Sequence, residues 1–492
     1  MRTDIARAFR HAFVYGGAVA ASKAIGFVMI PVYTRVLSLA NYGAMELLDL
    51  TMVVLGIVLA MGLNAAVVRY YFIAQDDRER KALVSTAAVF SLITAAVAGI
   101  VLVLMAPHIA TSVAGRKAFA GLFLLAVLTN AFDAATVVPL AWIRVRERSF
   151  LYSAIHMARI VAGLALNIWL VVVLRLGVQG VMISGLVVAV CSAVPLTFVV
   201  LRSVGARLSG RALVGMLRYG LPMVPASLSM FVLHFSDRLF LQRCTSMAEV
   251  GLYGLAYKFA MTLPFLVGQP LSLMWGPYSF DLARRPDGGK VIARTATYFC
   301  VGIAAYAVAL GALIPHVMRL IASPRFFPAH VPVPALLAGM ALLASVTIFE
   351  TGVLIERRTG LRAASVGAAA VVNFAANWLL IPRMGMMGAA WATTIGCAVV
   401  WALSLRFSQK VHPIPYEWSR LAKVALAGML AFLLAHSIST PNAWLSLAGR
   451  SAAVGTMVFW LWLFRFFHPQ ETLAVRTVLR GVAMRRAGEA EA

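Results

Sequence analysis

The chain has 492 residues, of which 62% are hydrophobic and 12% are charged, and its mean hydropathy is +0.88. These values exclude an ordinary soluble domain and predict a membrane protein that crosses the bilayer many times. The net charge of +25 does not indicate nucleic-acid binding, because Lys and Arg form short clusters between apolar runs of membrane-spanning length.

The first residues, 1–11, mix three Arg with apolar side chains and are expected to form an amphipathic helix on the cytoplasmic surface. About fourteen apolar runs follow. They lie at 12–37, 43–72, 82–106, 118–143, 149–174, 178–201, 219–242, 251–275, 292–315, 332–355, 361–381, 386–406, 420–438 and 447–467. Pro264, Pro270 and Pro277 predict a break in the eighth run.

The distribution of Lys and Arg predicts the orientation. With the N-terminus in the cytoplasm, the cytoplasmic loops carry most of the basic clusters, as the positive-inside rule requires. These clusters include Arg78/Arg80/Lys81, Arg144/Arg146/Arg148, Arg202/Arg207/Arg211/Arg218, Arg284/Arg285/Lys290, Arg357/Arg358/Arg362 and Arg406/Lys410/Arg420/Lys423. An even number of spans returns the C-terminus to the cytoplasm, where the basic tail rests on anionic lipid or is solvated.

Two parts of the chain repeat at one constant offset. The offset carries Arg35-Val-Leu-Ser-Leu-Ala-Asn-Tyr-Gly43 onto Arg243-Cys-Thr-Ser-Met-Ala-Glu-Val-Gly251, and Arg175-Leu-Gly177-Val-Gln-Gly180 onto Arg383-Met-Gly385-Met-Met-Gly388. We therefore predict an all-α integral membrane protein with two parallel six-helix repeats around a central cavity, followed by two C-terminal helices. The expected parts are an amphipathic N-terminus (1–11), an N-lobe (12–201), a cytoplasmic linker (202–218), a C-lobe (219–406), the last two spans (407–468) and a basic cytoplasmic tail (469–492).

Charged residues inside the spans mark the candidate site, because each costs about 2.5–3.5 kcal/mol at mid-depth. The cations Lys23, Arg238, Lys258 and Arg159 are expected to form a cationic cavity for an anionic substrate. The carboxylates Asp49, Glu46, Asp237 and Asp133 would pair with these cations or take up a proton or an ion. The alternative is structural, with ion pairs such as Asp237 with Lys258 or side chains that reach the interface.

The functional interpretation is favoured for Lys23, which is the deepest of the cations. The structural interpretation is favoured for Arg159, Asp133 and Glu350. It also applies to most of the amides within spans, including Asn130, Asn167, Asn373 and Asn377, which are expected to form hydrogen bonds between helices.

Polar and aromatic side chains on the same spans suggest a wall that contacts sugar. We assign Asn64, Gln269, Tyr257 and Tyr253 to this wall. The alternative for the tyrosines is the aromatic belt at the membrane interface. No cofactor, metal or enzymatic activity is expected, because the sequence has no Walker A or GxGxxG motif, no metal-ligand spacing, no paired cysteines and no nucleophile–base constellation.

Several motifs stand out along the chain. They are Ser22-Lys23-Ala-Ile-Gly26-Phe27, Pro31-Val-Tyr-Thr-Arg35-Val-Leu-Ser38 with Tyr42-Gly43, Gly220-Leu-Pro222 with Asp237-Arg238, Val250-Gly251-Leu-Tyr253 with Ala256-Tyr-Lys258, and Asn377-Trp-Leu-Leu-Ile381-Pro382 followed by Gly385 and Gly388. These motifs resemble those of the bacterial polysaccharide transporters in the multidrug/oligosaccharidyl-lipid/polysaccharide exporter superfamily. Together they cover roughly 10–410.

The resemblance implies a flippase for undecaprenyl-diphosphate-linked oligosaccharides, such as O-antigen or exopolysaccharide repeat units, in the bacterial inner membrane. It implies membrane lipids, and also polysaccharide polymerase and glycosyltransferases, as partners, and no nucleic acid. Lys23 falls where related lipid II flippases carry a basic residue. Met29 and Ile30 occupy the region of a second one, which argues against lipid II.

Three other functions stay open at this point. The main alternative is a cation- or proton-coupled exporter of drugs from the same superfamily, whose site would be dominated by carboxylates. A membrane-embedded glycosyltransferase or polymerase would need a catalytic carboxylate or a large polar loop, and neither is found. An assembly scaffold without transport is the third.

Overall fold

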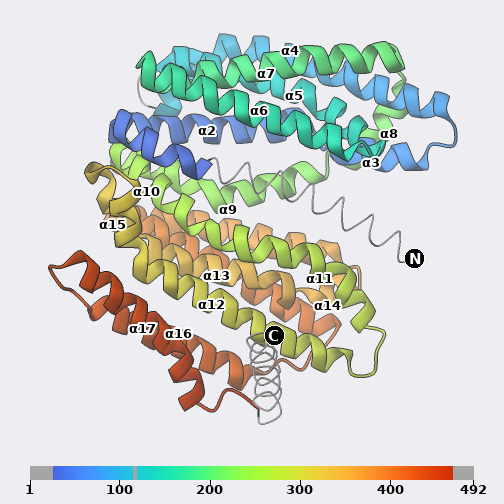
Figure 1. Ribbon diagram of the computed structural model, residues 1–492. Helices are drawn as coiled ribbons and strands as arrows, with labels where there is room; N and C mark the ends of the chain where they lie inside the picture. The colour runs from blue at the N-terminus through green and yellow to red at the C-terminus, as the bar shows by residue number, and fades with distance from the viewer. Residues whose placement is uncertain (1–25, 115–118, 469–492) are drawn as a thin grey trace, which may run out of the picture. The chain divides into compact units, whose positions relative to one another are not determined.

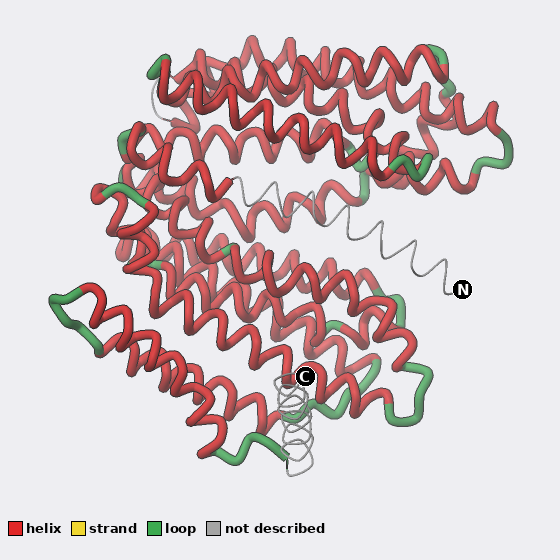
Figure 2. The backbone as a smooth tube through the Cα atoms, viewed as in Figure 1, coloured by secondary structure: helices red, strands yellow, loops and turns green. Residues whose placement is uncertain are grey.

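The computed structural model describes residues 26–114 and 119–468. Every regular element in these ranges is a helix (Figure 2). Eleven of the described helices are long and apolar enough to cross a membrane. The chain is therefore an all-helical integral membrane protein, as its composition predicts.

The helix bounds follow the predicted runs closely. A short apolar helix, Gly26–Val36, comes first. The following helices are α2 (Leu39–Ala60), α3 (Leu63–Ile73), α4 (Asp77–Ala114), α5 (Ala120–Val145), α6 (Ser149–Ile168) with the π-helix η2 (Trp169–Val173), α7 (Gly177–Val204), α8 (Gly210–Gly220), α9 (Met223–Cys244) and α10 (Met247–Ala260). The remaining elements are η3 (Pro264–Gly268), α11 (Gln269–Leu282), α12 (Gly288–Ile321), η4 (Pro324–His330), α13 (Val333–Phe349), α14 (Thr351–Ile355), α15 (Thr359–Val411), α16 (Trp418–Ser437) and α17 (Ala443–Leu463).

Two compact units share the chain. The first comprises Met1–Tyr257, Met318–Pro332 and Ala363–Gly396, and the second comprises Lys258–Val317, Val333–Arg362 and Cys397–Ala492. Helices α10, α12 and α15 contribute residues to both. The lobe boundaries expected from the repeat stay predictions, because these units are defined by packing.

In the first unit, helices α4 to α7 lie side by side (Figure 1), and α5 also contacts α2 and α3. Small side chains make this close packing possible. Ala66, Ala87 and Ala141 are at most 1% exposed in the core that joins α3, α4 and α5. Lipid is as apolar as a leucine side chain, so close van der Waals contact, rather than hydrophobic burial, holds such helices together.

The second unit has an aromatic core on α11, α12 and α13. The indole of Trp275 donates to the Thr351 hydroxyl at 2.7 Å. The phenol of Tyr416, in the loop before α16, donates to the Ile348 carbonyl at 3.1 Å. Burial raises the pKa of the Tyr416 phenol, which therefore keeps its proton and this bond.

Breaks in the spans have local causes. Helix α2 ends because Met61 and Gly62 both adopt left-handed backbone angles, with φ of 44° and 67°. The break predicted in the eighth run is confirmed, since the π-helix η3 begins at Pro264. Helix α15 is two helices joined at Gly385, with φ 53° and ψ −132°, as the separate runs 361–381 and 386–406 predict.

The expected cytoplasmic linker contains a helix that the sequence analysis did not identify. Helix α8 begins after Ser209, whose hydroxyl accepts a hydrogen bond from the Ala212 amide at 3.4 Å. Helix α8 is short and strongly amphipathic, with Met216 fully buried on its apolar side.

Repeat-related positions share their local geometry. Ser38 accepts a hydrogen bond from the Asn41 amide at 3.2 Å, and its counterpart Ser246 accepts one from the Glu249 amide, also at 3.2 Å. The counterparts Gly177 and Gly385 are both left-handed, with φ of 58° and 53°. The predicted internal repeat therefore extends to helix caps and turns.

Candidate functional site

Charged residues from α2 and α9 meet in the interior of the first unit. Asp237 and Arg238 of α9 are 1% and 2% exposed, and Glu46 of α2 is 5% exposed. The tyrosines Tyr253 and Tyr257 of α10 lie against them. We call these five residues the buried charge cluster.

Arg238 is held from several directions. Its Nη1 atom donates to Asp237 Oδ1 and to the His234 carbonyl, both at 3.0 Å. Its Nε atom lies 3.9 Å from Glu46 Oε2. Its guanidinium carbon lies 4.3 Å from the centre of the Tyr257 ring. A planar, permanently charged guanidinium is the side chain best able to bond two carboxylates and stack on a ring at once.

Asp237 uses both of its carboxylate oxygens. Oδ1 accepts from the Arg238 amide at 2.8 Å as well as from its guanidinium. Oδ2 accepts from the Tyr253 hydroxyl at 2.6 Å and from the Thr393 hydroxyl at 3.3 Å. A buried carboxylate needs such donors, because an unsatisfied charge in an apolar interior is very costly.

A glycine of α10 leaves the space that the Glu46 side chain occupies in the buried charge cluster. A Cβ atom at Gly254 of α10 would lie 2.6 Å from Glu46 Cγ and 2.7 Å from its Cδ. Gly254 is the repeat counterpart of Glu46. The missing side chain on one repeat therefore provides the space that the acidic side chain of the other repeat occupies.

A polar network joins α9 to both halves of α15. Asn377 Nδ2 donates to the Ser236 hydroxyl at 3.2 Å and to Asn373 Oδ1 at 3.1 Å. Asn373 Nδ2 donates to the Ala392 carbonyl at 3.1 Å.

A separate amide joins α5 to α2, where Asn130 donates to the Met52 carbonyl at 2.7 Å. These bonds confirm the predicted role of Asn130, Asn373 and Asn377 between helices.

The structure describes two of the other three predicted cations. Lys23 is outside the described residues. Lys258 is half-buried near the end of α10. Arg159 of α6 forms an ion pair with Asp133 of α5, and their side chains are 22% and 40% exposed. This pair agrees with the structural interpretation favoured for both residues.

The predicted sugar wall is not one surface in the first unit. Asn64 is exposed and accepts a hydrogen bond from Arg144 at 2.8 Å, while Tyr253 and Tyr257 are only 0% and 2% exposed. Neither tyrosine lies in an interfacial belt, so that alternative is wrong. Gln269, in the second unit, is exposed as the first residue of α11, and Asp49 is exposed on α2, one turn beyond the buried Glu46.

Three contributors to the site were missed. Ser236 and Thr393 carry hydroxyls, which can bond within their own helix and so leave no mark in an apolar run. The third is His234, whose Nδ1 lies 2.7 Å from the Tyr257 hydroxyl. In the described part of the chain, no group of three His, Cys, Asp or Glu side chains is placed to hold a metal ion.

Helical spans with a charge cluster buried inside them define the chain as a membrane protein of transporter fold. The structure of the lipid II flippase MurJ in an inward closed conformation matches it with a TM-score of 0.74 at 12% identity, over 91% of this chain and 97% of that one. A multidrug resistance MATE family transporter of the MOP superfamily, inward-facing, matches with a TM-score of 0.62 at 16% identity, over 82% and 96% of the two chains. A mutant of the Vibrio cholerae MATE transporter VcmN matches with a TM-score of 0.59 at 14% identity, over 83% and 97%.

The sequence itself identifies the family. Residues 8–283 match the family model described as "Polysaccharide biosynthesis protein", and the chain belongs to that family. A search of curated proteins finds no match.

Proposed function

We propose that this protein is a flippase, which moves an undecaprenyl-diphosphate-linked oligosaccharide from the cytoplasmic to the periplasmic leaflet of the bacterial inner membrane. The observation that carries this proposal is the family match over residues 8–283, on a chain whose fold resembles that of the flippase MurJ. The proposed cargo is an O-antigen or exopolysaccharide repeat unit. Met29 and Ile30, where a second basic residue would favour lipid II, are 5% and 1% exposed apolar residues.

The chemistry of the cargo explains the cations in the spans. A diphosphate carries about two negative charges, which the bilayer core excludes. Lys23, Arg238, Lys258 and Arg159 are the proposed contacts that replace water around it. A negative-inside potential favours outward movement of the anion by about 2.3 kcal/mol per charge per 100 mV.

Exchange of ion-pair partners is the proposed coupling step. In the described conformation, the Arg238 guanidinium is bonded to Asp237 and lies beside Glu46. Uptake of a proton or a cation by Glu46 or Asp237 would weaken this attachment and free Arg238 for the diphosphate. Asp49 and Asp133 are the further carboxylates assigned to coupling or to ion pairs.

The proposed cycle is alternating access, in which two repeats rock about a site near the bilayer midplane. Both termini are cytoplasmic in this proposal, as the distribution of Lys and Arg predicts. The protein is a transporter and not an enzyme. A polysaccharide polymerase and glycosyltransferases are proposed partners on the two faces of the membrane.

Reconstitution in liposomes tests the proposal. A fluorescent polyprenyl-diphosphate oligosaccharide is placed in one leaflet, and its appearance in the other is followed by quenching, with and without an imposed potential. Movement above that in empty vesicles supports the proposal, as does its loss in Lys23→Ala at unchanged protein level. Equal rates with and without the protein, for either sign of the potential, would overturn it.

Drug export is the second candidate function, because two MATE transporters share the fold and two side chains of the buried charge cluster are carboxylates. The same vesicles distinguish the two functions. A drug exporter would move a cationic dye in response to a proton or sodium gradient and would leave the labelled lipid in place. A flippase would do the reverse.

A further inference from the structure

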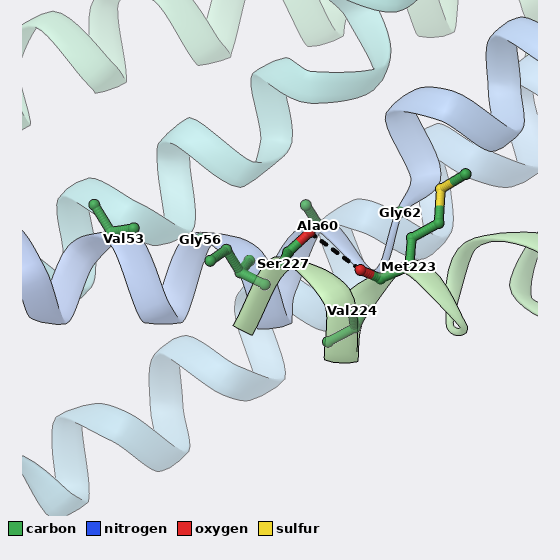
Figure 3. A pocket seen from close by; sticks show the side chains of 8 residues that line it. Val53, Gly56, Ala60, Gly62, Met223, Val224 and Ser227 are labelled. Carbon is green, nitrogen blue, oxygen red and sulfur yellow. Dashed lines mark hydrogen bonds between the residues drawn. The ribbon is translucent and has the colours of Figure 1, made fainter. Parts of the chain in front are cut away.

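A cavity of about 350 Å³ lies between α2 and α9 in the first unit (Figure 3). Helix α2 contributes Val53, Gly56 and Ala60 among others, the turn after it contributes Gly62, and α9 contributes Met223 and Ser227. From Val53 to its last residue, Ala60, helix α2 rises roughly 10 Å, about a third of the thickness of the hydrocarbon core. The cavity is therefore a slot that runs along the last two turns of α2.

The wall of the slot is apolar. Three of its residues are small, Gly56, Ala60 and Gly62, and they leave the space open. Ser227 is the one polar side chain among the described residues that line it, and its hydroxyl donates to the Met223 carbonyl at 3.1 Å (Figure 3). With that hydroxyl already bonded, the wall suits a hydrocarbon chain better than a sugar or a phosphate.

At the Gly62 end of the slot, neighbouring residues contact two guanidinium groups. Gly62 touches the backbone of Gly220, so a Cβ at Gly62 would lie 2.5 Å from the Gly220 carbonyl oxygen. Two residues beyond Gly62, Asn64 accepts a hydrogen bond from Arg144 at 2.8 Å. Next to Gly220, the Tyr219 ring has the Arg69 guanidinium 4.4 Å from its centre.

Neither arginine is neutralised there. Across the described ranges, no carboxylate forms an ion pair with Arg69 or with Arg144. Arg69 is exposed and Arg144 is half-buried. An apolar slot with unneutralised guanidinium groups at one end matches a molecule with one hydrocarbon chain and an anionic head.

We infer that this slot binds the first isoprene units of a polyprenyl diphosphate as it enters from the cytoplasmic side, with the diphosphate held by Arg69 and Arg144 before it reaches the cations proposed above. The inference rests on the proposed flippase function and names the part of the protein that takes the lipid tail. A slot of this volume admits one chain and not the two chains of a glycerophospholipid. On the orientation expected from Lys and Arg, its charged end faces the cytoplasm, where such a substrate is made.

The chain contains a matched control on the other side of α9. A second cavity, also about 350 Å³, lies between α9 and α15 and is lined by Ser229, Val232 and Ala370 among others. Ser229 donates to the Pro225 carbonyl at 2.9 Å, as Ser227 does to Met223. Ser227→Leu fills the first slot, and Ser229→Leu fills the second cavity. The two variants make the same change of side chain on the same helix, so they form a matched pair.

The test is photocrosslinking to the full-length protein in lipid nanodiscs. The probe is a polyprenyl diphosphate with a diazirine on its second isoprene unit, and labelled peptides are mapped by mass spectrometry. We expect labels on 53–62 and 223–227, reduced at least fivefold by Ser227→Leu and unchanged by Ser229→Leu. Val53→Trp fills the slot from α2 and is expected to act like Ser227→Leu, which covers the case in which one variant fails to fold.

Further arms identify the ligand. Arg69→Gln with Arg144→Gln should reduce labelling at least fivefold, and a polyprenol without phosphate should label the slot at least tenfold less. Equal labelling by the polyprenol, or by a diazirine phosphatidylglycerol, would overturn the assignment. So would labelling that is insensitive to Ser227→Leu and Val53→Trp, or a slot cysteine that crosslinks only to residues 1–25 of the chain.

The flippase assay on the same preparation separates the two proposals. If wild-type protein transports the labelled lipid but the slot is not labelled, the slot assignment fails and the flippase proposal stands. If no transport is seen, the flippase proposal fails whatever the probe labels.

Discussion

Gly43 of α2 and Gly251 of α10 lie backbone to backbone, and a Cβ atom at either position would be 3.0 Å from the amide nitrogen of the other. The contact is reciprocal, because that same Cβ would meet the Met247 carbonyl oxygen from Gly43 and the Leu39 carbonyl oxygen from Gly251. Gly43 and Gly251 are repeat counterparts, and so are Leu39 and Met247, so the repeat exchanges one of these contacts for the other. The two repeats therefore meet at a local two-fold axis, where any side chain would force the helices apart.

Alanine at Gly43 or Gly251 tests this contact. The new Cβ atoms would lie 2.0 Å from the Met247 oxygen and 2.4 Å from the Leu39 oxygen. We expect each variant to lose about 1–3 kcal/mol of stability, measured as a lower Tm in detergent. Gly367→Ala is the control, because no atom lies within 4 Å of its Cβ, and it should leave Tm unchanged or raise it.

Arg238 should contribute to folding stability by neutralising its two carboxylate neighbours. Arg238→Met leaves Asp237 and Glu46 buried without this guanidinium and should cost about 3–5 kcal/mol. Adding Glu46→Gln and Asp237→Asn removes those charges and should restore much of the lost stability. Tm and yield of folded protein on size-exclusion chromatography measure both effects, and a triple variant no more stable than Arg238→Met would contradict the assignment.

The two buried tyrosines should differ in importance. Tyr253→Phe removes a donor from the Asp237 carboxylate, which should cost about 1.5–3 kcal/mol. Tyr257→Phe removes a hydroxyl that lies 2.7 Å from His234 Nδ1, a hydrogen bond whose loss should cost about 1 kcal/mol. Both variants keep the aromatic rings near Arg238, so thermal unfolding of the pair isolates the hydroxyls. A larger loss in Tyr257→Phe would refute the ranking.

The left-handed glycines Gly177 and Gly385 should tolerate alanine unequally. Both substitutions carry the backbone penalty of about 1–2 kcal/mol for a left-handed residue with a side chain. At Gly177 the Cβ would have an ordinary contact at 3.9 Å, whereas at Gly385 it would lie 2.8 Å from Glu249 Oε2. We expect Gly385→Ala to lower Tm more. Gly177→Asn should recover part of the loss at 177, since Asn adopts this conformation more readily.

The sequence predicted the elements of the fold better than their contacts. The apolar runs correspond to helices, the break at Pro264 is confirmed, and the offset that pairs Ser38 with Ser246 extends to the same cap bond. Helix α8 was missed because its apolar residues are interrupted by Arg and Gly, which made the segment read as a loop. Composition and periodicity report on how a segment contacts lipid and water, which was sufficient for the apolar spans but not for helix α8.

The partners within the site were harder to predict. Adjacent residues on a helix do not face each other, so nothing in the sequence paired Asp237 with Arg238. Tyr253 was expected at a sugar wall or an interfacial belt, but it is buried because Asp237 and Thr393 offer its hydroxyl partners. These relations depend on helices brought together from distant parts of the chain, which one sequence does not reveal.

The Glu46–Gly254 contact limits how alike the two repeats can be. The local two-fold axis brings equivalent positions of the two repeats together, and there is room there for only one side chain. A glutamate in one repeat therefore requires a glycine at the equivalent position of the other. Two identical repeats would place either two glutamates in collision or two glycines, with no carboxylate, at positions 46 and 254. The Glu46 carboxylate fits in the interior of the first unit only because the two repeats differ at this position.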